Sequence, residues 1–187
     1  VPMFEPSDSQ ECRDMLIEAY EISEKHDIPV LLRLTTRVCH SKSLVELGER
    51  ADVGIKPYVK NIKKYVAVPA NARPMKVKIQ QHRELLKEYS NNCRWNRAEY
   101  HDTKLGIICS GDCYLYACEV FGDGASYLKL GFTNPLPDQM ILDFASKVEK
   151  IYIIEENDPY LEHWVKSLGF ACKGKDVFPA WGEMTPD

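Results

Sequence analysis

The chain has 187 residues, of which 44% are hydrophobic and 28% charged, and its formal net charge is −4. This composition is typical of a globular chain with one large core or two small ones. No stretch approaches the roughly 20 apolar residues of a membrane-spanning helix, and a pI near 5.8 is well below that of a nucleic-acid-binding domain. We therefore expect neither a membrane nor a nucleic acid as partner.

The N-terminal segment, residues 1–40, predicts one helix followed by one strand. Asp8 and Glu11 have the spacing of a capping box, and apolar residues recur after them at helical intervals until about residue 25. Residues 28–34 predict a buried strand. Because Val1 leads directly into a helix start, and residues 181–187 suggest no finished element, we interpret the chain as a piece of a longer polypeptide.

The middle segment, residues 41–103, predicts an irregular connector with a short strand at 63–70 and a helix at 75–90. Between residues 56 and 87 there are nine Lys and Arg residues against one acid, Glu84. A solvated face explains such a run, and so does a docking surface for an acidic partner.

The C-terminal segment, residues 104–187, alternates strands with helices. The expected strands are 104–109, 126–131 and 151–154, and the expected helices are 112–121, 137–148 and a last one with Asp158 as its N-cap. This alternation predicts a parallel sheet with right-handed crossovers. The whole chain is then an α/β protein, two α/β units joined by a connector.

Three local patterns resemble ligand motifs but lack the context that those motifs need. Gly169–Asp176 resembles a phosphate-binding loop, yet it follows a helix and has no hydroxyl residue after its lysine. Gly122–Gly124 resembles the start of a diphosphate–magnesium motif, yet it ends a helix. The spacing of Cys109, Cys113 and Cys118 suits neither zinc nor an iron–sulfur cluster. We expect no metal site, and the odd count of seven cysteines indicates a reducing, cytoplasmic compartment.

Two groups of polar residues follow expected strands, where parallel sheets bind ligands. Thr35, Thr36, Arg37 and His40 follow the first strand and could hold a carboxylate or an anionic cofactor, although a hydrogen-bonded corner explains them as well. Ser110, Gly111 and Asp112 follow the second, and Glu155 and Glu156 follow the last. Helix capping accounts for Ser110 and Asp112, and an exposed or interface loop accounts for the two glutamates, so their assignment to a cofactor stays open.

Several longer runs resemble the alpha subunit of indolepyruvate ferredoxin oxidoreductase, in the family of thiamine-dependent 2-oxoacid:ferredoxin oxidoreductases. They keep their order over nearly the whole chain, and the T-T-R-x-x-H-S pattern favours the indolepyruvate branch. These runs are E-P-S-D-S-Q-E-C-R-D-M, A-Y-E-I-S-E-K-H-D-I-P-V-L-L-R-L-T-T-R-V-C-H-S, V-P-A-N-A-R, L-G-I-I-C-S-G, S-Y-L-K-L-G-F-T-N-P-L-P, I-E-E-N-D-P-Y-L-E, G-K-D and G-E-M-T-P.

The resemblance implies a fold for each segment. Residues 1–40 would be the tail of a thiamine pyrimidine-binding-type α/β domain, and residues 41–103 the basic connector. Residues 104–187 would be a transketolase C-terminal-like, Rossmann-like domain, a three-layer α/β/α sandwich around a parallel sheet.

The resemblance also implies a function. Such enzymes decarboxylate a 2-oxoacid, here an arylpyruvate, on thiamine diphosphate and magnesium; electrons leave through iron–sulfur clusters to ferredoxin, and coenzyme A takes the acyl group. The activating glutamate and the cluster cysteines have no counterpart here, so no catalytic residue is carried over, and Thr36, Arg37 and His40 are expected only near the active site.

We therefore expect the isolated chain to be inactive and to contact other parts of its parent and a beta subunit. A sister enzyme for pyruvate or 2-oxoglutarate and a stand-alone α/β assembly or binding module are the alternatives.

Overall fold

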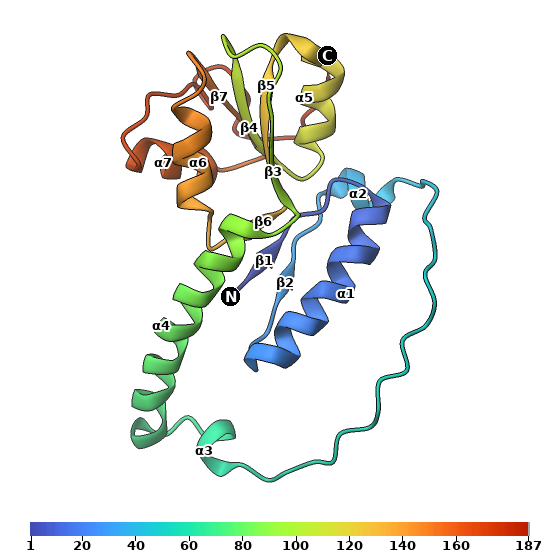
Figure 1. Cartoon of the computed structure of the whole chain (residues 1–187), viewed down its shortest axis with the longest axis vertical. Coiled ribbons are helices and arrows are strands. Elements are labelled where there is room, and N and C mark those ends of the chain that lie inside the picture. The colour runs from blue at the N-terminus through green and yellow to red at the C-terminus, as the bar shows by residue number, and fades with distance from the viewer. Residues whose placement is uncertain (187) are drawn as a thin grey trace.

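The computed structural model describes residues 1–186, and Asp187, the last residue of the predicted 104–187 segment, lies outside the described residues. The strands form two sheets, a main one and a small one (Figure 1). The main sheet has the spatial order β3 (Asn96–Glu99), β5 (Ser126–Leu130), β4 (Gly106–Ser110) and β7 (Ile151–Ile154). The small sheet has the order β2 (Leu31–Leu32), β1 (Met3–Phe4) and β6 (Phe132–Asn134).

Helices cover both faces of the main sheet, which confirms the predicted three-layer α/β/α arrangement. Helix α5 (Cys113–Phe121) lies on one face, while α6 (Asp138–Ala145) and α7 (Tyr160–Ser167) lie on the other (Figure 1). Side chains of β4 alternate between the two cores: Ile107 and Cys109 pack toward α5, and Ile108 packs toward α6 and α7. A sheet buried on both faces explains why the strand sequences are almost continuously apolar.

The main sheet is mixed rather than wholly parallel, which corrects one part of the prediction. Strand β4 runs parallel to β5 and to β7, as expected, but β3 pairs antiparallel with β5 at the edge. Strand β3 has the sequence N-R-A-E, which is too polar and too short to stand out as a strand. It forms a strand because it pairs with β5, and the local sequence pattern does not predict that pairing.

The N-terminal half is built around the small sheet, with α1 (Ser9–His26) and α4 (Pro69–Asn92) on its two sides (Figure 1). Phe4, Met15, Leu86 and Phe132 are central to this second core, and the rings of Phe4 and Phe132 meet edge to face at 4.9 Å. The expected N-cap of α1 is confirmed, because the Asp8 side chain accepts a hydrogen bond from the backbone N–H of Glu11 at 2.8 Å.

Two predictions in the first hundred residues are wrong. Residues 63–70 are not a strand: α3 (Ile62–Tyr65) is a single helical turn, and α4 begins at Pro69, whose fixed φ suits a helix start. The strand predicted at 28–34 shrinks to β2, which lies at a sheet edge and leaves Leu31 half-exposed. Its apolar run packs on one side only, against α1 and β1.

The first part of the connector, between α2 (Thr36–His40) and α3, is an extended, exposed segment that passes around the outside of the N-terminal half (Figure 1). Two pairings cross the predicted segment boundaries: β3 joins the main sheet, and β6 joins the small sheet beside β1. The domain boundaries at residues 40 and 103, which follow from the family resemblance, therefore remain predictions. Within residues 1–186, each helix is too short or too polar to span a lipid bilayer.

Candidate functional site

Buried polar side chains gather where the C-terminal ends of β4, β5 and β7 approach the N-terminal segment. The main sheet contributes Ser110, Lys129 and Glu155, and the N-terminal segment contributes Glu5 and Ser7; each of these residues is less than one tenth exposed. This is the edge of the sheet at which the sequence predicted ligand-binding residues.

Glu5 is at the centre of this polar cluster because three donors converge on its carboxylate. Ser110 and the Arg33 guanidinium donate to Oε2 at 2.8 and 2.9 Å, and Thr133 donates to Oε1 at 2.9 Å. Glu5 follows β1 directly, and its own N–H donates to the carbonyl of Gly131 at 2.8 Å. The carboxylate thus ties the end of β4 to both edges of the small sheet.

Lys129 is the second charged centre. It lies on β5, one of the two inner strands of the main sheet. Its ammonium donates to Ser7 Oγ at 2.9 Å, forms an ion pair with Glu11, and stands 5.0 Å from the centroid of the Tyr114 ring. Burial alone would raise the pKa of Glu11, but the charge and hydrogen bonds of Lys129 and the hydrogen bonds from Ser7 outweigh it and lower the pKa. Burial lowers the pKa of Lys129 more than the attraction of Glu11 raises it.

The predicted group after β4 meets the predicted group after β2. Thr35 donates to Asp112 Oδ2 at 2.7 Å, and a Cβ added at Gly111 would lie 3.8 Å from Thr35 Cγ2. Gly111 has φ +58°, a conformation that other residues adopt at a cost, so glycine suits this turn into α5. Asp112 occupies the N-cap position of α5 without a side-chain cap bond, and among the described residues its buried Oδ1 has no hydrogen-bond partner. That oxygen can accept a hydrogen bond from a water or a ligand.

The predicted residues of the first group lie on α2, with their side chains largely in solvent. Thr36, Arg37 and His40 are all exposed, whereas Thr35 caps the helix. Arg37 Nε lies 2.7 Å from Glu183 Oε1, and this hydrogen bond and the charge of Glu183 raise the pKa of Arg37. Arg37 therefore holds a carboxylate already, one supplied by a residue 146 positions further along the chain.

Glu155 and Glu156, the predicted pair after β7, have different environments. Glu155 is buried, and its two oxygens accept the backbone N–H groups of Leu161 and Glu162 at 2.7 and 3.0 Å. Burial raises the pKa of Glu155, against the two N–H bonds, which lower it. Among the described residues, Glu156 accepts a hydrogen bond from the Met184 N–H alone, at 3.3 Å, and burial followed by the charges of Asp112 and Glu183 raises its pKa.

The last helix begins one residue later than the sequence predicts. The N-cap position of α7 is Pro159 rather than Asp158, and proline has no side-chain acceptor for the free N–H groups. Glu155 reaches them from the end of β7 and takes over the capping role. A negative charge at this position also interacts favourably with the positive end of the helix.

Both arginines of the site are paired, Arg33 with Glu5 and Arg37 with Glu183, so an anion binds to either of them by displacing a carboxylate. Sequence reasoning missed Glu5, Ser7, Arg33, Lys129 and Thr133; the signal that could have found one of them is a lysine inside the apolar strand S-Y-L-K-L. Among residues 1–186, His, Cys, Asp and Glu do not form a group of three or more suited to a metal ion. All seven cysteines are free.

Comparison with known proteins gives relatives for almost the whole chain. The indolepyruvate oxidoreductase subunit IorA of Methanothermobacter marburgensis is 38% identical over 183 residues, which is 95% of this chain and 29% of that subunit. IorA of Pyrococcus abyssi is 36% identical over 99% of this chain and 31% of its own length. No family model matches the chain. The chain is thus homologous to one section of IorA and spans less than a third of these relatives' length.

A solved structure gives the same picture of the fold. The 2-oxoglutarate:ferredoxin oxidoreductase from Magnetococcus marinus matches 99% of this chain and 40% of its own, with a TM-score of 0.67 and 16% sequence identity. At that identity the match shows the fold alone, which is the α/β fold expected from the sequence.

Proposed function

We propose that this homologue of one IorA section serves in the alpha subunit of a thiamine-dependent 2-oxoacid:ferredoxin oxidoreductase that acts on arylpyruvates such as indolepyruvate. The observation that carries the proposal is the 38% identity to IorA over 95% of the chain. The whole enzyme would decarboxylate the oxoacid oxidatively, transfer the acyl group to coenzyme A and pass electrons to ferredoxin in the cytoplasm. Seven free cysteines fit a reducing compartment of that kind.

The described residues do not fit the cofactors that this reaction needs. A magnesium–diphosphate site needs several oxygen ligands together, and an iron–sulfur cluster needs about four cysteines together. Within residues 1–186, His, Cys, Asp and Glu do not form a group of three or more that could hold a metal ion, and Cys109 and Cys113 are buried in the core between β4 and α5. We therefore assign thiamine diphosphate, magnesium and the clusters to other parts of the parent and its beta subunit, and we expect the isolated chain to be inactive.

We assign to Arg37 the task of holding the substrate carboxylate. Its guanidinium is exposed at the end of the small sheet and already holds the Glu183 carboxylate at 2.7 Å. A 2-oxoacid presents the same chemical group, so it can take the place of Glu183. His40 and Thr36 lie on the same short helix and complete the surface that faces the substrate.

Replacing Arg37 by alanine in the parent enzyme should lower kcat/KM for the oxoacid by about tenfold or more, since a lost hydrogen bond to a charged group removes about 1.5–3 kcal/mol. The measurement is oxoacid-dependent dye reduction. Arg50→Ala, at an exposed arginine of the connector, is the matched control and should leave the kinetics unchanged. Unaltered kinetics in a folded Arg37→Ala enzyme would assign Arg37 to the Glu183 contact alone.

The basic connector is our candidate for the surface that docks ferredoxin, an acidic protein. Part of its charge is already neutralised, because Lys56 pairs with Glu24, and Lys64 and Lys78 pair with Asp27. Lys60 and Lys63 are exposed, and residues 1–186 supply no ion-pair partner for them. These two lysines are therefore among the cations of the run that can attract an acidic partner.

Reversing both charges, Lys60→Glu and Lys63→Glu, should slow ferredoxin reduction several-fold at low salt and leave dye reduction unchanged, because electrostatic attraction mainly accelerates encounter. The difference should shrink as the salt concentration rises. Lys104→Glu with Lys150→Glu, two exposed lysines beside the main sheet, is the control. Ferredoxin rates equal to wild type would leave the connector as a solvated face, and a parallel loss of dye reduction would point to folding or assembly.

A further inference from the structure

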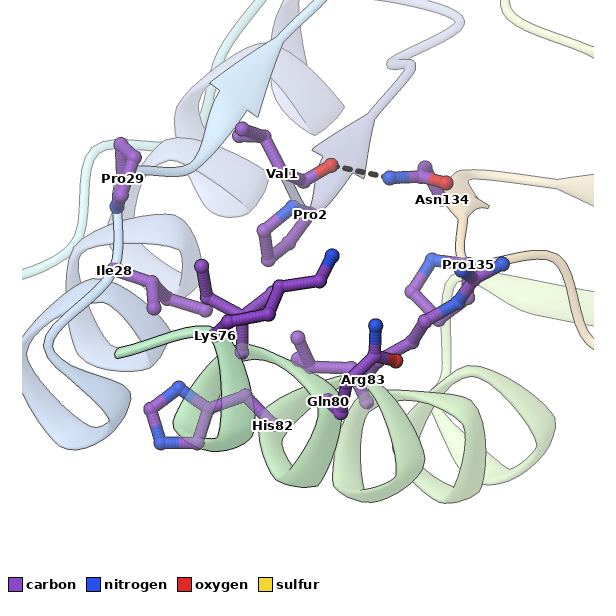
Figure 2. A pocket seen from close by; sticks show the side chains of 12 residues that line it. Val1, Pro2, Ile28, Pro29, Lys76, Gln80, His82, Arg83, Asn134 and Pro135 are labelled. Atoms are coloured by element: carbon purple, nitrogen blue, oxygen red, sulfur yellow. Dashed lines mark hydrogen bonds between the residues drawn. The ribbon is translucent and has the colours of Figure 1, made fainter. Parts of the chain in front are cut away.

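A hollow of about 470 Å³ lies between α4, residues 1–2, residues 28–29 and the turn after β6. None of its lining residues belongs to the candidate functional site. Its volume falls in the range of small-molecule sites, about 300–1,000 Å³. Figure 2 shows Lys76, Gln80 and Arg83 rising from α4 toward Pro2 and Pro135.

The wall of the hollow is mainly apolar. Pro2, Pro29 and Pro135 give rigid ring surfaces, and Ile79 and Leu86 add aliphatic side chains from α4. Leu86 is buried in the second core, so this part of the wall is fixed by packing. A flat or branched apolar group of a ligand can therefore be buried against this preformed surface.

The polar groups of the hollow are two neutral amides, Gln80 and Asn134, a histidine and two cations. Lys76 and Arg83 lie two turns apart on the same side of α4, and none of the Asp and Glu residues within 1–186 lines the hollow. Within residues 1–186 neither of them takes part in an ion pair, in contrast to Lys78 on the same helix, which pairs with Asp27. The ring of His82 lies toward α1 and stands 5.6 Å from that of His26, so it belongs to the rim.

We propose that this hollow binds an organic anion with an apolar, ring-sized body, whose acidic group lies between Lys76 and Arg83. Two unpaired cations over an apolar wall favour such an amphiphilic anion over a neutral ring or a small inorganic ion. The neutral ring lacks the charge interaction, and the inorganic ion leaves the wall in water. The inference is independent of the oxidoreductase function proposed above.

The test uses naphthalene-2-sulfonate as probe on the 187-residue chain, with the methyl NMR signals of Ile28, Ile79 and Leu86 as readout. We expect saturable shifts of these signals. The matched neutral probe, naphthalene-2-sulfonamide, and sulfate alone should each bind at least about tenfold more weakly, because each lacks one half of the interaction.

Variants of the two cations identify the anion contact. Lys76→Met and Arg83→Met should each weaken the sulfonate about tenfold, Arg83→Lys should retain most of the affinity, and Arg73→Met, an exposed cation of α4 outside the hollow, should change nothing. Both replaced side chains are exposed, so the variants should melt at the wild-type temperature. The proposal is overturned by shifts elsewhere in the chain, by the absence of saturable binding, or by equal affinity for sulfonate and sulfonamide.

Discussion

Replacing Lys129 by alanine should lower the free energy of unfolding by about 3–5 kcal/mol, because it leaves a partner charge in a largely water-free site. Lys129 is 1% exposed, and its ammonium contacts Glu11 and Ser7, both from the N-terminal segment. Without it, the Glu11 carboxylate keeps Ser7 as a donor and has Arg97 only at 3.8 Å. Urea unfolding followed by circular dichroism measures the loss.

Two further variants separate the charge from the packing. Lys129→Met with Glu11→Gln removes both charges and keeps most of the volume, so it should recover much of the lost stability. Lys104→Ala, an exposed lysine two residues before β4, should stay within about 0.5 kcal/mol of wild type. If Lys129→Ala is no worse than Lys104→Ala, the buried pair does not join the two halves of the fold.

The same pair sets a pH dependence whose sign follows from Glu11. Its pKa is lowered in the folded chain from the ordinary value of 4.5, so the folded state favours the charged carboxylate. The resulting stability is present above the unfolded pKa and disappears as the pH falls through the lower, folded value. The difference between wild type and the Lys129→Met, Glu11→Gln variant should therefore shift against wild type only in acid, below about pH 4.5.

Most of the main sheet could be predicted because its strands are buried on both faces. Residues 151–154 are all apolar because their strand lies between two layers of helices. Each helix between the strands has one apolar face, which packs on the sheet. The local rules fail where a partner far along the chain decides the outcome. Strand β3 exists because β5 pairs with it, and Glu5 is buried because Ser110, 105 residues away, donates to it.

The candidate site shows the same division. A strand end followed by glycine or polar residues is visible in the sequence, and the structure brings Thr35 and Asp112 from two such ends into contact at 2.7 Å. The charge partners are not visible, because Arg37 meets Glu183 and Lys129 meets Glu11 only through the fold. Residue type reveals that a charge exists, whereas tertiary contacts decide whether it is neutralised.

The adjacent acids Glu155 and Glu156 offer the last and sharpest test, because sequence alone could not tell them apart. Glu155→Ala should lower the free energy of unfolding by about 2–6 kcal/mol, since it leaves the buried N–H groups of Leu161 and Glu162 without an acceptor, at about 1–3 kcal/mol each. Glu156→Ala loses only the 3.3 Å contact with Met184 and should lose less than about 1 kcal/mol. Hydrogen exchange should show faster exchange of the Leu161 and Glu162 amides in the first variant only. Equal effects of the two variants would mean that α7 does not depend on Glu155 for its cap. The Glu155 carboxylate would then be available to bind a ligand.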